Sequence, residues 1–84
     1  MPATQVPTTR TSTTRIMRTP EFERGFEEAR KGEAFDWRIN DWNYERGRLF
    51  AHIAPLNLPL RIDGKLNPKA VALCDAAFNR RLIV

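Results

Sequence analysis

The sequence predicts a mainly all-α fold, a small three-helix domain with a short extended edge segment and a disordered N-terminal arm. Apolar residues recur at helical spacing in three segments, at about residues 20–31, 42–54 and 68–81. Each segment follows a residue that can cap a helix, and two of the caps precede a proline, which suits the first helical position. The length of 84 residues leaves room for one domain.

The predicted arm covers residues 1–18, and the helical domain covers residues 19–84. Residues 1–20 contain seven threonines, three prolines, three arginines and no acidic residue, so they cannot bury enough apolar surface to offset the entropy of ordering. The arm holds three of the 14 basic residues, which leaves 11 basic and 10 acidic residues in the body. Most of the net charge of +4 therefore belongs to the arm.

The first predicted helix starts at Thr19-Pro20 and stops at Gly32. Its apolar stripe consists of Phe22, Phe26 and Ala29. Glycine inside a helix costs roughly 1 kcal/mol against alanine and needs a reason. We therefore expect the glycines of the first two helices, at positions 25 and 47, to permit a close helix approach.

The second predicted helix follows Asn40 or Asp41 and ends before Pro55. A helical wheel places four apolar residues on one face: Trp42, Leu49, Phe50 and Ile53. The same wheel places four residues on the opposite side: Tyr44, Glu45, Arg48 and His52. Arg46 falls inside the apolar stripe. It can pair with an acid of the first helix, lie over Trp42 as a cation–π contact, or anchor a partner.

Residues 56–62 alternate apolar and other side chains, which predicts an extended segment, and Pro59 restricts it to a sheet edge. Asp63-Gly64 predicts a turn, and Asn67-Pro68 starts the third helix. That helix is apolar over about half of its circumference. It must be central to the fold or lie in an interface, and a homodimer through residues 68–81 is one such interface.

No pattern of catalytic or metal-ligating residues is present, so we expect no enzyme activity, no metal and no cofactor. His52 is the only imidazole and is expected on the surface rather than acting as a base. Cys74, the only cysteine, is expected in the core rather than acting as a nucleophile. The chain has no apolar run long enough for a membrane span and no secretory signal, which predicts a cytoplasmic protein without membrane contact.

Two sets of side chains suit binding. The expected nucleic-acid contacts are Arg10, Arg15, Arg18, Arg46 and Arg48. The alternative for the first three is that the arm carrying them is an unbound solubilising tail. The expected partner-binding aromatics are Trp37, Trp42 and Tyr44, because tryptophan, tyrosine and arginine dominate binding hot spots. The alternative is that these aromatics pack the first helix against the second.

One stretch resembles a known group. Arg24-Gly25-Phe26 followed by Gly32, with Trp42 and the Tyr44-Glu45-Arg46-Gly47-Arg48 run beyond, resembles the ribosome modulation factor-like small proteins over about residues 20–54. Phe26 stands where that family has tyrosine, and the family's Cys-Pro-Tyr element is missing. The resemblance implies a two-helix unit that contacts ribosomal RNA or ribosome-associated partners. Small phage and plasmid proteins are similar to the same group.

The sequence therefore favours a small non-enzymatic regulatory protein whose partner is the ribosome or another RNA. The alternative function is a phage-type adaptor or inhibitor that binds a host protein complex. A near-neutral body, abundant aromatics and the broad apolar face of the third helix motivate this alternative.

Overall fold

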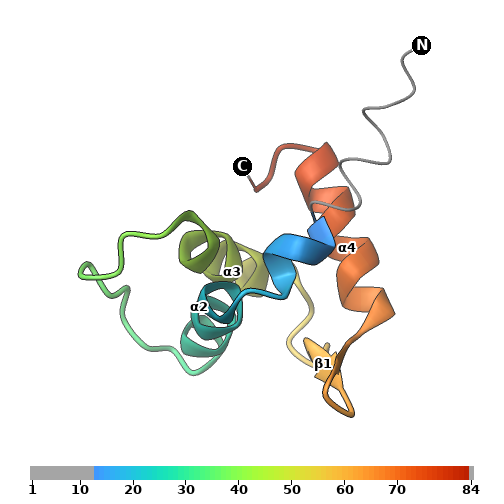
Figure 1. The fold of residues 1–84 in the computed structure, drawn as a ribbon, viewed down its shortest axis with the longest axis horizontal. Coiled ribbons are helices and arrows are strands. Elements are labelled where there is room, and N and C mark those ends of the chain that lie inside the picture. Colours follow the sequence, from blue (N-terminus) through green and yellow to red (C-terminus); the bar gives the residue numbers. More distant parts are fainter. Residues whose placement is uncertain (1–12, 84) are drawn as a thin grey trace.

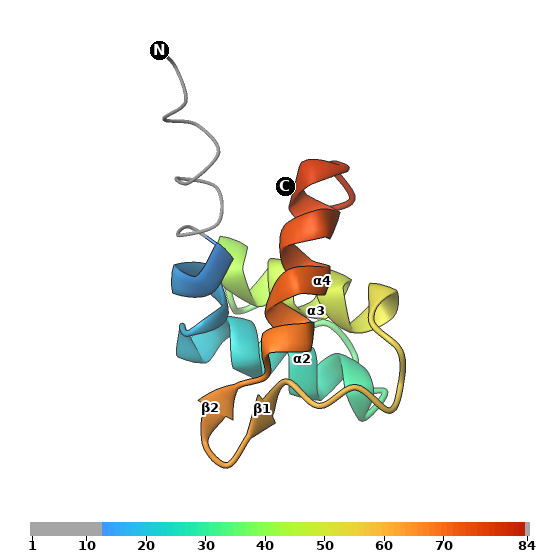
Figure 2. The same cartoon turned by 90° about the vertical axis from the view of Figure 1, so that its right-hand side faces the viewer.

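The computed structural model describes residues 13–83 and shows a mainly helical fold, which confirms the predicted fold class (Figure 1). Residues 13–17 form a short helical segment. The elements that follow it are α2 (Pro20–Arg30), α3 (Trp42–Ile53), β1 (Arg61–Ile62), β2 (Lys65–Leu66) and α4 (Pro68–Asn79). Figure 2 shows α4 crossing the paired helices α2 and α3, which is the central one of the two positions that the sequence left open.

The predicted caps form where expected. The Thr19 hydroxyl accepts from the Phe22 N–H (3.2 Å) and donates to the Ile16 carbonyl (2.7 Å), so it ends the helical segment 13–17 and starts α2. Asp41 caps α3 through the N–H groups of residues 43 and 44, and Asn67 caps α4 through the Lys69 N–H (3.1 Å). Helix α2 ends in a Schellman motif with Gly32 at a φ of 77°.

Helices α2 and α3 pack antiparallel at a distance that only glycine allows. A Cβ added at Gly25 would lie 3.0 Å from the Tyr44 carbonyl carbon and 3.1 Å from the Arg48 nitrogen, and closer still to the Tyr44 oxygen. A Cβ at Gly47 would clash in the same way with the Phe22 carbonyl. The two glycines thus form a reciprocal contact between backbones, which confirms the expected close approach.

This contact fixes the rotation of α3 and overturns the predicted apolar face. Because Gly47 must face α2, the buried positions of α3 are Tyr44, Gly47, Phe50 and Ala51. Trp42, which the wheel placed on the buried stripe, is instead 68% exposed. Gly47 determines which side of α3 meets α2. The helical wheel was interpreted from the large apolar residues, so it did not predict which side the glycine would take.

The extended segment is shorter than predicted. Only Arg61–Ile62 forms a strand, and it pairs antiparallel with Lys65–Leu66 through a two-residue turn. Asp63 and Gly64 both have positive φ, 54° and 79°, as a type I′ turn requires. The carbonyls of the preceding residues 55 and 56 are occupied, since both accept from the Arg30 guanidinium (2.7 and 2.9 Å).

The helical segment 13–17 corrects the predicted arm of residues 1–18. Met17 is fully buried, and the buried Thr13 hydroxyl donates to the Asp75 carboxylate of α4 (2.8 Å). Composition predicted disorder here, but the apolar side chains of Ile16 and Met17 pack against the core, and the hydrogen bond from Thr13 attaches the segment to α4. Residues 1–12, with Arg10, lie outside the described part of the chain.

The core combines residues from all the helices. It confirms Cys74 as a core residue. Its members are Met17, Phe22, Phe26, Phe50, Ala51, Ala54, Leu60, Ala70, Cys74, Ala77 and Ile83.

We expect Gly25→Ala to lower the free energy of unfolding by about 1–3 kcal/mol, because the added methyl group meets backbone atoms that cannot move aside. The better helix propensity of alanine offsets only part of this loss. Urea denaturation measures the effect. Glu27→Ala, at an exposed position of the same helix, is the control and should change stability by less than about 0.5 kcal/mol. Equal midpoints for Gly25→Ala and the wild type would contradict the close contact.

Candidate functional site: a cationic groove

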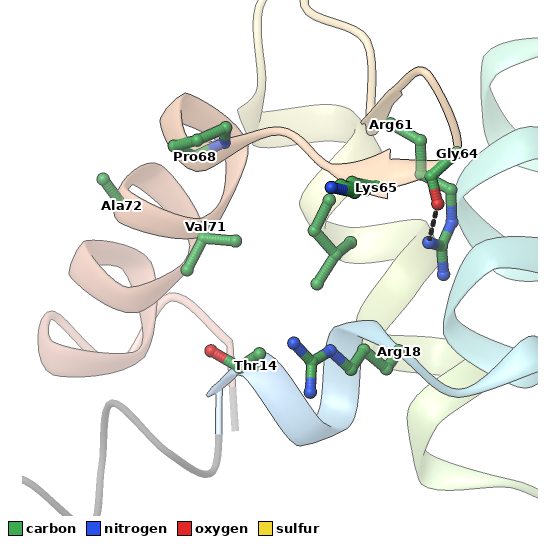
Figure 3. A pocket seen from close by; sticks show the side chains of 9 residues that line it. Thr14, Arg18, Arg61, Gly64, Lys65, Pro68, Val71 and Ala72 are labelled. Atoms are coloured by element: carbon green, nitrogen blue, oxygen red, sulfur yellow. Dashed lines mark hydrogen bonds between the residues drawn. The ribbon is translucent and has the colours of Figure 1, made fainter.

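A groove of about 820 Å³ opens between the helical segment 13–17, the β1–β2 hairpin and the first turns of α4 (Figure 3). It is defined by its nine lining residues, which come from three separate parts of the chain: Thr14, Arg18, Arg61, Gly64, Lys65, Leu66, Pro68, Val71 and Ala72. Three of these are cationic and none is acidic. We call this site the cationic groove.

The three cations differ in how far their charges are compensated. The Arg61 guanidinium pairs with the Glu23 carboxylate of α2 (3.2 Å) and donates to the Gly64 carbonyl (3.1 Å). Among residues 13–83, the exposed side chains of Arg18 and Lys65 make neither an ion pair nor a hydrogen bond. Two positive charges in the groove are thus free to meet an anion.

Local structure explains why these cations lie together. The type I′ turn folds the hairpin so that Arg61 and Lys65 lie near its tip. Thr19 ends the helical segment directly after Arg18, and Figure 3 shows the Arg18 guanidinium extending across the groove. On the side of α4, Val71 and Ala72 supply an apolar wall.

A second exposed feature lies at the other end of the molecule. Residues 33–42, which are the loop before α3 together with the first residue of that helix (the tryptophan loop), project away from α4 in Figure 1 and carry both tryptophans of the chain. Trp37 is 87% exposed and packs only one side against Phe35, with ring centroids 4.8 Å apart. Arg46 lies over the Trp42 ring at 6.0 Å and donates to the Asn43 side chain (2.8 Å).

A polar network behind the tryptophan loop holds it in place. The buried Tyr44 hydroxyl donates to Glu28 Oε1 (2.6 Å) and accepts from the Asp36 backbone N–H (3.0 Å). Arg48 donates to the Glu33 carbonyl (2.8 Å), and its guanidinium lies 5.6 Å from the Phe35 ring centroid. The loop is therefore fixed to both α2 and α3.

The same network shifts the acidity of its carboxylates. The hydrogen bond from Tyr44, and then the one from Arg24, lower the pKa of Glu28 below its ordinary value of 4.5. Hydrogen bonds from the Arg38 side chain and backbone lower the pKa of Asp36. Both groups are stabilised as carboxylates by the fold.

The predicted binding residues fall into different places. Arg15 and Arg18 are exposed on the helical segment, and Trp37 and Trp42 are exposed on the loop.

Two predicted sites are corrected. Tyr44 is not a surface residue, because its ring is buried at the glycine contact and its hydroxyl is bonded on both sides. Arg48 is not an open phosphate contact, because its side chain is only 14% exposed and binds the loop. Arg46 adopts the cation–π arrangement with Trp42.

Sequence reasoning missed Arg61 and Lys65. Both flank the Asp63-Gly64 turn, and a cation on each side of a hairpin turn was a visible signal. Its significance depended on the helical segment 13–17 packing opposite the hairpin, which the composition of that segment argued against.

The other candidate residues are accounted for. Burial raises the pKa of the Cys74 thiol to about 12, so the thiolate does not form at neutral pH. His52 is exposed. Among residues 13–83, no cluster of histidine, cysteine or acidic side chains could hold a metal ion, and no helix is long and apolar enough to cross a bilayer.

No protein-family model matches the chain, and no curated protein or solved structure shows significant similarity to it.

Because the folded-state pKa of Glu28 is lowered, its contribution to stability is present above pH 4.5 and is lost as the pH falls through the folded value. We expect the melting temperature of the wild type to fall with acid in this range. Glu28→Gln should lose part of that dependence. Glu27→Gln, an exposed neighbour in α2, should keep all of it. Thermal melts by circular dichroism between pH 7 and pH 3 measure this, and parallel curves for Glu28→Gln and the wild type would refute it.

Proposed function

We propose that this chain is a small, non-enzymatic RNA-binding protein that holds the phosphate backbone in the cationic groove. One observation carries the proposal: Arg18, Arg61 and Lys65 line one concave site without an acidic lining residue. Lysine and arginine side chains that neutralise phosphates provide most of the affinity of such proteins for nucleic acid. The exposed Arg15, on the same helical segment, extends the positive surface.

The distribution of charge supports a local site rather than a generally basic protein. The body has nearly equal numbers of basic and acidic residues. Binding that depended on overall charge would be weak, so a phosphate should be drawn to the place where cations lack counterions. The choice of RNA over DNA rests on the resemblance of residues 20–54 to ribosome modulation factor-like proteins.

Because Arg61 is already paired with Glu23, two phosphate contacts remain, those of Arg18 and Lys65. On a single strand they give a slope of about −1.4 for log affinity against log salt, or ~7-fold weaker binding for a fourfold rise in salt. Arg18→Gln combined with Lys65→Gln should remove most of that slope and weaken binding about tenfold at physiological salt. Fluorescence anisotropy with a labelled single-stranded RNA measures both quantities.

Lys69→Gln is the matched control, because Lys69 is also an exposed cation near the start of α4 but does not line the groove. Combined with Lys31→Gln, another exposed cation, it removes the same charge elsewhere. If the groove pair and the control pair of substitutions lowered RNA affinity equally, binding would depend on net charge and not on the groove. Binding that is insensitive to salt would reject the proposal.

A second candidate function is the phage-type protein-binding adaptor or inhibitor, and the tryptophan loop favours it. Trp37 and Trp42 are exposed at 87% and 68%, on a loop that hydrogen bonds hold rigid. Charges around them are mixed, with Asp36 paired to Arg38 (3.0 Å). Rigid tryptophans beside arginines are typical of protein hot spots.

The exposed apolar residues near the end of α4 are also relevant to this candidate. Leu82 is 54% exposed beside a small hollow of about 50 Å³ that Leu73 and Ala76 line. The homodimer through residues 68–81 would use this face of α4.

A further inference from the structure

We infer that the cationic groove binds an unpaired nucleotide, with its base stacked on the Arg18 guanidinium and facing the apolar wall of α4. This inference rests on the proposed RNA-binding function and specifies the class of RNA: a single strand, a loop or a bulge rather than a duplex.

The groove combines cations with apolar residues. A site that only neutralised phosphates would need cations on an open surface. Here Pro68, Val71 and Ala72 of α4 form an apolar wall, with Leu66 of β2 beside it. When such a wall covers the face of a base, apolar surface is removed from water, which favours binding. The faces of paired bases are stacked inside a duplex and cannot reach it, whereas unpaired bases can be turned outward.

Arg18 presents its guanidinium plane to the groove (Figure 3). The Arg61 guanidinium is held by Glu23 and Gly64, but Arg18 has no such partner within residues 13–83. Its planar group extends over the groove toward the side of Thr14 and Val71 (Figure 3). Arginine planes stack on unpaired bases, and lysine has no plane to offer. Arg18 can therefore both provide charge and stack on a base, whereas Lys65 can only provide charge.

The size of the groove also suits a nucleotide. At about 820 Å³, the groove lies in the range of sites that enclose a small organic molecule. The hairpin and the helical segment 13–17 border it on two sides. One nucleotide can enter between them, with its phosphate on Lys65.

The test exchanges charge-conserving residues. Arg18→Lys keeps the positive charge and removes the plane, so affinity for single-stranded RNA should fall at least about fivefold while the salt slope stays unchanged. Lys65→Arg, the reverse exchange in the same groove, should not weaken binding. A 12-nucleotide RNA without self-pairing and a hairpin RNA of equal charge with a short closed loop are the two probes. The wild type should prefer the single strand, and Arg18→Lys should reduce that preference.

A variant of the wall provides an independent check. Ala72→Gln changes no charge and keeps a good helix former at an exposed position of α4. It should weaken binding of the single strand without changing the salt slope, whereas Ala76→Gln, one turn further along α4 and outside the lining of the groove, should not.

The outcomes separate the two proposals. If Arg18→Lys binds the single strand as the wild type does, or if the duplex binds as well as the single strand, the groove neutralises phosphates only and this inference is overturned while RNA binding stands. If the wild type binds neither RNA in low salt, both proposals fail.

Discussion

The contact between Gly25 and Gly47 determines how the rest of this protein is arranged. Each glycine accepts the backbone of the opposite helix, which brings α2 and α3 closer than any side chain would permit. With that face of α3 turned inward, Tyr44 is buried at the contact, and Phe50 reaches the rings of Phe22 and Phe26 at 6.0 and 5.7 Å. The exposed position of Trp42 is a consequence of the same rotation. The packing of this small core is thus determined by a backbone contact as much as by apolar side chains.

The cationic groove depends indirectly on the packed pair of helices α2 and α3. The hairpin is attached to α2 through Arg61 and Glu23, and the helical segment 13–17 is attached to α2 through Thr19. On the opposite side, Thr13 binds Asp75 of α4. Three segments far apart in sequence are therefore held around one space, and their positions relative to one another follow from the rigid pair beneath them.

Much of the fold followed from local rules. Thr19, Asp41 and Asn67 act as caps at the predicted starts because their short polar side chains satisfy free amides. The third helix was predicted to reach residue 81 but ends at Asn79, because Arg81 adopts a positive φ of 62° that a helix does not contain. This position is commonly glycine, so the sequence carried no stop signal there.

The candidate site could not be predicted in the same way, because it depends on tertiary contacts. Arg18 was expected to bind phosphate from a disordered arm, and the structure places it instead on a packed segment beside Lys65. The sequence contained the residues but not their proximity. Conversely, Arg48 was predicted to bind nucleic acid, but its guanidinium donates to a loop of its own chain. Whether an arginine is engaged or available depends on the acids and carbonyls that the fold brings near it.

We propose that RNA binds the cationic groove and not the tryptophan loop. Titrating the isotope-labelled protein with a short single-stranded RNA and following its amide and indole NMR signals tests this directly. We expect the amide signals of Gly64, Lys65 and Val71 to shift, while the indole signals of Trp37 and Trp42 stay in place. Shifts centred on the two indoles, with the amides of the groove unmoved, would contradict it.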